Sequence, residues 1–98
     1  MIESFTERTF LDHLNTMFQV FGEGADPLDV ELVKVTSLSS PKQVQFSILF
    51  QGPANLFLPQ RTYTLEHEIL GKFDLFLVPV GKNTKGFEYE AVFNRAAE

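Results

Sequence analysis

The stretch that most constrains the fold is Leu56–Val80, which reads as a β-hairpin. Its first run, Thr62–His67, is rich in β-branched and aromatic residues, which favour strands. Its second run, Lys72–Val80, is strongly apolar, and Gly71 between the two runs is free to take a positive φ. A two-stranded hairpin is marginally stable alone, so other elements must cover its apolar face.

The chain on either side of this hairpin predicts four more strands. Val44–Gln51 alternates apolar and polar residues with a period of two, which is typical of a strand with one face in the core. The apolar phase slips between Leu32 and Val33, so either both faces are partly buried there or a β-bulge resets the register. The other strands are predicted at Met17–Gly22, Asp29–Leu38 and Phe87–Asn94.

One helix is predicted before the strands, at Ser4–Asn15. Ser4 and Glu7 have the spacing of a capping box, in which two free backbone donors are satisfied. The helix would present a single apolar stripe to the rest of the protein, formed by Phe10, Leu11 and Leu14.

These elements predict one mainly β (α+β) domain over residues 1–98, with an N-terminal helix followed by about six antiparallel strands. Short turns favour pairing between strands that are neighbours in sequence, closed into a small barrel or a two-layer sandwich. Pro79 cannot donate to a ladder, so we expect broken pairing on its amide side and a turn from Val80 and Gly81. The predicted core comprises Phe46, Ile48, Phe50, Leu65, Leu75, Leu77 and Phe93.

The second run of the hairpin also provides the best clue to function, because it is apolar on both faces. Phe73, Leu75 and Leu77 lie on one face, and Phe76, Val78 and Val80 on the other. One face can meet the core, whereas the other needs either the helix or a second chain to cover it. Glu88 and Glu90 share a strand face that is either solvated or a docking site for a basic partner. The candidate partner surface is Phe76, Val78, Glu88 and Glu90.

Composition disfavours several other classes of partner. The net charge of −5 disfavours nucleic acid and anionic membrane surfaces, both of which select positive charge. No apolar run approaches the roughly 20 residues of a membrane span, and no signal peptide is evident. The chain has no cysteine, which excludes disulfides and thiolate chemistry and fits a cytoplasmic location.

The two histidines favour structural roles over metal binding or catalysis. His67 lies between Glu66 and Glu68, but neighbouring residues of a strand point to opposite faces, so the three cannot chelate one ion. We expect His67 to be hydrogen-bonded near the core, with a ligand or partner contact as the lesser alternative. His13 follows Asp12 on the predicted helix, where adjacent side chains diverge, which indicates a solvated face.

Acidic residues gather near one loop, at Glu23, Asp26, Asp29 and Glu31. They could hold calcium, but the ligand spacing of an EF-hand is absent and a solvated acidic rim is favoured. The serines and glycines form no nucleophile or phosphate-binding motif. We therefore expect no catalytic residue, no metal site and no cofactor.

Several phrases of the chain resemble an uncharacterised family of small bacterial domains. They are Thr9-Phe10 with Phe18 and Val20, Leu49–Pro53, Leu58–His67, Leu70-Gly71, Leu75–Gly81 and Tyr89–Asn94. The resemblance implies a domain of unknown function, some members of which lie beside phage-tail-collar-like proteins. Together with the apolar outer residues, it predicts a noncatalytic structural or protein-interaction module that binds a protein partner or itself. The alternative is a β-barrel domain that binds a small molecule or carbohydrate at its mouth.

Overall fold

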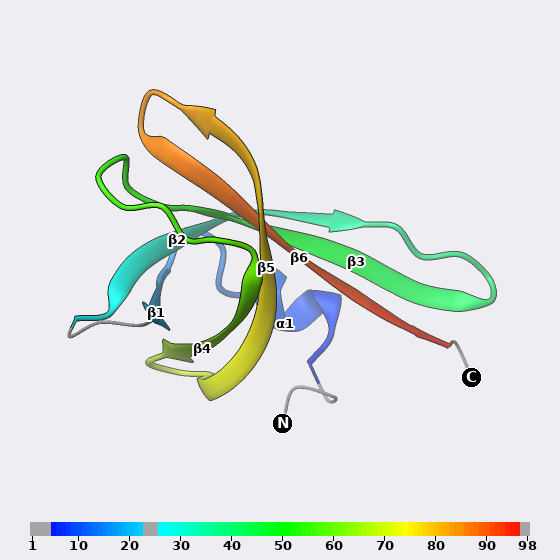
Figure 1. Ribbon diagram of the computed structural model, residues 1–98. Coiled ribbons are helices and arrows are strands. Elements are labelled where there is room, and N and C mark those ends of the chain that lie inside the picture. The colour runs from blue at the N-terminus through cyan, green and yellow to red at the C-terminus, as the bar shows by residue number, and fades with distance from the viewer. Residues whose placement is uncertain (1–4, 23–25, 97–98) are drawn as a thin grey trace.

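The computed structural model describes residues 5–22 and 26–96, in which one short helix precedes six strands (Figure 1). The elements are α1 (Glu7–Leu11), β1 (Met17–Phe21), β2 (Leu28–Ser37), β3 (Gln43–Gln51), β4 (Arg61–His67), β5 (Gly71–Asn83) and β6 (Gly86–Ala96). Each strand is found where the sequence predicts one, although several of the boundaries differ.

The six strands form one antiparallel sheet that returns on itself in the order β1-β2-β3-β6-β5-β4. Pairing of β1 with β4 completes the ring, from Gln19 opposite Glu66 to Phe21 opposite Thr64. The prediction of pairing only between sequence neighbours is therefore wrong. The residues numbered 52–60 carry the chain from β3 to β4 without pairing those two strands, and β3 pairs with β6 instead. β1, β2 and β3 pair in succession, and β4 returns to pair with β1. These four strands therefore form a Greek key.

The predicted hairpin is confirmed as β4 and β5, which pair from Arg61 opposite Leu77 to His67 opposite Gly71. Gly71 has a φ of 80°, as the turn requires. The turn predicted at Val80 is wrong, because β6 supplies partners for β5 as far as Asn83.

Pro79 lies where a strand can accommodate proline. The register between β5 and β6 shifts between Pro79 and Gly81, which marks a bulge. Gly52 N–H donates to Phe87 O, and backbone groups alternate in direction along a strand, so those of Tyr89 also point toward β3. Tyr89 is opposite Pro79, so the amide side of Pro79 faces away from β6 and toward β4. The pairing of β5 with β4 has already ended at Leu77, and Pro79 therefore has no partner strand on that side. The predicted break in pairing is confirmed.

The helix is much shorter than the predicted Ser4–Asn15. Its cap is Thr6, whose Oγ1 accepts from Thr9 N–H at 3.3 Å while Thr6 N–H donates to Thr9 Oγ1 at 2.9 Å. Ser4 lies outside the described residues. The helix cannot extend to Asn15, because that residue has a φ of 64° and its N–H donates to Leu32 O of β2.

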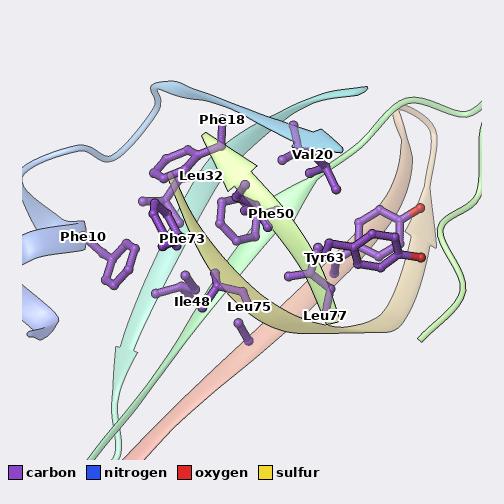
Figure 2. Packing of buried hydrophobic residues seen from close by; sticks show 14 of the residues in the cluster. Phe10, Phe18, Val20, Leu32, Ile48, Phe50, Tyr63, Phe73, Leu75 and Leu77 are labelled. Carbon is purple, nitrogen blue, oxygen red and sulfur yellow. The ribbon is translucent and has the colours of Figure 1, made fainter. Parts of the chain in front are cut away.

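The core fills the interior of the ring (Figure 2). Alternate residues of each strand point inward, and Phe46, Ile48, Phe50, Leu65, Leu75 and Leu77 are all buried as predicted. Phe93 is only half-buried, stacked on Phe46 with ring centroids 4.7 Å apart. The register of β2 against β3 shifts between Leu32 and Lys34, so the bulge was the correct alternative.

Candidate functional site

The four residues predicted as a partner surface lie together on the outside of β5 and β6. Val78 is directly opposite Glu90 in the ladder, and Glu88 is opposite Gly81. Phe76 precedes Val78 on the same face and is 51% exposed. We call this region the outer β5–β6 surface, and its members are Phe76, Val78, Val80, Glu88, Glu90 and Val92.

Phe76, Val80 and Val92 of this surface are exposed because the helix lies elsewhere. Phe10 of α1 is fully buried, with its ring against those of Phe46 and Phe93, and Phe5 packs edge-on against Phe73. The segment thus closes one end of the core, between β5 and the pair β3–β6 (Figure 1). Of the two covers considered for Phe76, the helix is excluded.

The helix stripe itself differs from the prediction. Phe10 is buried and Leu14 packs against the core, but Leu11 is 36% exposed. Because α1 ends at Leu11, the helical spacing that would align these three residues is lost.

His67 is a structural histidine, as predicted. It is 5% exposed, and its Nδ1 accepts from the backbone N–H groups of Ile69 and Leu70 at 3.0 and 3.2 Å. The proton of a neutral ring is therefore on Nε2, which lies 3.0 Å from Thr16 Oγ1. Thr16 Oγ1 in turn donates to His13 O. Both ring nitrogens are thus occupied in joining the β4–β5 turn to the segment before β1.

The surroundings of His67 favour its neutral form. Burial is the main cause that lowers its pKa below 6.5, and the nearby His13 lowers it further, while Glu68 acts in the opposite direction. The ring centroids of His13 and His67 are 4.7 Å apart.

The expected solvated position of His13 is wrong. The residue follows the end of α1, is half-buried and packs on the ring of His67. Its neighbour Asp12 pairs with Arg8 instead, with Nε and Oδ1 3.0 Å apart. The pairing of histidines 54 positions apart had no signal in the sequence, because it depends on how the segment before β1 crosses the β4–β5 turn.

The acidic residues near the β1–β2 loop do not converge. Glu31 accepts from Asn15 at 3.2 Å, and Asp29 is opposite Gln19 in the ladder. Asp26 instead borders a pocket whose wall includes Tyr63. Glu23 lies outside the described residues. Within the described part of the chain, no group of three or more acidic, histidine or cysteine side chains could hold a metal ion.

A small pocket lies at the end of the ring away from α1, where the alternative prediction placed a ligand, but the residues that line it were not predicted. Its volume is about 180 Å³, and its wall includes the half-exposed Leu56 and Phe57 together with Arg61 and Tyr63. The Arg61 guanidinium lies 5.1 Å from the centre of the Tyr63 ring. The only signal in the sequence was the apolar run Leu56-Phe57-Leu58 inside a segment that otherwise reads as a loop.

Hydrogen bonds and ring packing hold the wall of this pocket. Tyr89 is fully buried, and its hydroxyl accepts from Leu58 N–H at 2.9 Å. Burial raises the pKa of Tyr89, an effect that the bond from Leu58 partly offsets. Tyr63 OH donates to Pro59 O, and Phe57 packs edge-on against Phe87.

These features define a class of small, mainly β domain with an uncovered outer surface and a narrow end pocket. A family model described as Domain of unknown function (DUF6916) matches residues 5–93. The chain belongs to that family. Searches of curated proteins and of solved structures gave no match. In the part of the chain that the structure describes, no helix has the length and apolarity needed to cross a membrane.

Proposed function

We propose that the protein is a noncatalytic interaction module that binds a protein partner through the outer β5–β6 surface. The observation that carries this proposal is the exposure of Phe76, Val80 and Val92, which are each about half exposed on this surface, at 51%, 49% and 54%. Contiguous apolar side chains on the outside of a domain mark an interaction site more often than isolated ones do.

The energetics indicate what the partner must supply. Fully burying a large apolar side chain is worth roughly 1.5–3 kcal/mol, so three half-exposed side chains supply about 2–4 kcal/mol. Association costs an estimated 4–15 kcal/mol or more in lost freedom, so these contacts alone are insufficient. Glu88 and Glu90 are available to pair with basic groups of the partner, which would add affinity and specificity.

The lack of catalysis is part of the proposal and is supported by His67. A general base needs a ring nitrogen within hydrogen-bond reach of a substrate proton. Both nitrogens of His67 have partners within the protein, at Ile69, Leu70 and Thr16. Hydrolase or transferase activity that disappears in a folded His67→Ala variant would contradict this part of the proposal.

The family resemblance supports a biological setting for the module. The resemblance seen in the sequence implies phage-tail-collar-like neighbours, so we propose that the module belongs to a bacterial phage-tail-like or secretion assembly. The absence of cysteine fits a reducing compartment, and we expect assembly in the cytoplasm.

The experiment compares two variants in affinity capture from the native host. Phe76→Asp places a charge in the outer β5–β6 surface, whereas Ile69→Asp places one on the β4–β5 turn, where Ile69 is 69% exposed. We expect the same partner on the wild type and on Ile69→Asp, and at least a tenfold loss on Phe76→Asp, which corresponds to about 1.4 kcal/mol. Equal capture by both variants would exclude this surface.

A second candidate function is the binding of a small molecule or carbohydrate at the end pocket, as in a β-barrel with an open mouth. It is supported by the aromatic and apolar wall around Phe57 and Tyr63. Nuclear magnetic resonance titration with monosaccharides tests it. Shifts confined to the amides of residues 56–63 are expected if sugars bind there, and an unchanged spectrum at high sugar concentration would oppose it.

A further inference from the structure

The ring of His67 holds the β4–β5 turn against the segment before β1. Its Nδ1 accepts from the N–H groups of Ile69 and Leu70, and its Nε2 lies 3.0 Å from Thr16 Oγ1. Thr16 Oγ1 donates in turn to His13 O at 2.6 Å, and the His13 ring packs on His67. Two segments 51 positions apart in sequence are thus joined through one titratable side chain.

This joint holds only while the His67 ring is neutral. A second proton must bind at Nδ1, because Nε2 already carries one. A protonated Nδ1 is a donor, so it cannot accept from the N–H groups of Ile69 and Leu70. Proton uptake is therefore incompatible with the closed turn, which must move away before the ring becomes an imidazolium.

The surroundings of the ring do not compensate an added charge. Burial is the main cause that lowers the pKa of His67 below 6.5, and His13 lowers it further, while Glu68 acts in the opposite direction. The nearest group on β1 is the uncharged ring of Phe18, with its centroid 4.4 Å from that of His67. The closed turn thus excludes the proton by burial and by the neighbouring histidine.

The other charged groups on the neighbouring elements are engaged elsewhere. Asp12, before β1, pairs with Arg8 at 3.0 Å, and Glu31 of β2 accepts from an asparagine side chain at 3.2 Å. The Lys72 ammonium of β5 lies 5.4 Å from the centre of an aromatic ring of β1. Glu66 is opposite Lys72 in the ladder, on the outer face. None of these groups makes a described ion pair with His67.

We propose that His67, backed by His13, is an acid-sensitive latch that releases the β4–β5 turn from the segment before β1 when His67 takes up a proton. Release uncovers an apolar end of the core, because Leu70 of the turn packs against that core and Phe73 follows on β5 with only 8% exposure. The latch is separate from the outer β5–β6 surface, so it does not depend on the proposed function.

The opening is confined to the turn, because the ladders on either side do not depend on His67. β4 and β5 remain paired up to Glu66 opposite Lys72. Thr16 O accepts from Leu32 N–H at 3.1 Å, which keeps the segment before β1 on β2. A turn with few backbone bonds of its own opens at a lower free energy than the ladders beside it.

Hydrogen exchange of the full chain, followed by nuclear magnetic resonance, tests the latch. The amides of Ile69 and Leu70 report its bonds directly, and the amide of Ile48, in a strand paired on both sides, reports opening of the whole domain. Protection of Ile69 and Leu70 should fall by up to about tenfold for each pH unit below 6.5, because the open turn binds a proton that the closed turn excludes. Ile48 should stay at least about tenfold better protected throughout.

His67→Asn is the matched variant, because the Oδ1 of asparagine can accept from the same two N–H groups and does not titrate. We expect its protection at Ile69 and Leu70 to be independent of pH. His13→Gln keeps His67 and removes the neighbouring charge that opposes protonation of the closed turn, so protection should fall less over the same pH range.

The inference would be overturned by protection at Ile69 and Leu70 that is constant with pH in the unmodified chain. Equal protection at Ile48 would also overturn it, because the turn would then open only when the whole domain unfolds. So would an unchanged pH dependence in His67→Asn. If His67→Asn does not fold, His13→Gln decides, and a pH dependence identical to that of the unmodified chain would refute the latch.

Discussion

Gly86 at the β5–β6 turn offers a stringent test of the packing, through the substitution Gly86→Ala. Its φ is 145°, a conformation that L side chains rarely adopt. An added Cβ would lie 2.3 Å from Gly52 O, 2.4 Å from Pro53 C and 2.6 Å from Ala54 N. All three are backbone atoms, so the new methyl group cannot be accommodated by a change of rotamer.

The expected cost combines two contributions. Holding alanine in this backbone region costs about 1–3 kcal/mol. The close contacts must then be relieved by moving residues 52–54, which would disturb the 2.8 Å bond from Gly52 N–H to Phe87 O. We expect a total loss of about 4 kcal/mol or more, which is exceptional for one substitution.

Gly71→Ala is the matched control. Gly71 also has a positive φ, at 80°, but no atom lies within 4 Å of an added Cβ. Only backbone strain remains, so the loss should be about 1–2 kcal/mol. Urea unfolding followed by circular dichroism measures both free energies. If Gly86→Ala lost no more stability than Gly71→Ala, the close approach of the turn to residues 52–54 would be refuted.

Two further predictions concern the core and its histidine. Phe50→Ala should cost about 3–5 kcal/mol in urea unfolding, because Phe50 is fully buried against Phe18, and a loss below roughly 1 kcal/mol would contradict its inward position. Because the pKa of His67 is lowered by folding, the unfolded chain binds a proton at His67 more readily than the folded chain does. The contribution of His67 to stability is therefore complete above pH 6.5. That contribution should decline as pH falls from 6.5 toward the lowered value, by up to about 1.4 kcal/mol per pH unit. The same titration on His67→Gln should lack this component, and identical pH profiles would disprove the assignment.

Features that depend on residues close together in sequence were predictable. The alternation in Val44–Gln51 gave the correct inward face, because the period of a strand is set by its own backbone. The β4–β5 hairpin followed from two strand-forming runs and a glycine between them. The structural role of His67 followed from the alternation of faces along its own strand, because the neighbours Glu66 and Glu68 point outward while His67 points inward.

Errors arose where a local pattern competed with a distant partner. The Ser4–Glu7 spacing suggested a helix start, but the chain is capped at Thr6 and held to β2 by Asn15. Similarly, Pro79 suggested that the strand ends nearby, whereas β6 supplies bonds that continue β5 to Asn83. At the predicted end of the helix and at Pro79, hydrogen bonds to another strand outweighed the local signal.

The sequence by itself determined that this chain forms strands with a phenylalanine-rich inner face, because the apolar period is written into each segment. It also determined that β5 is apolar on both faces. Only the tertiary structure decided that β3 pairs with β6 and β1 with β4, since pairing partners are chosen by burial of the whole core. The same packing draws Phe10 into the end of the ring, and for that reason Phe76 is left facing solvent.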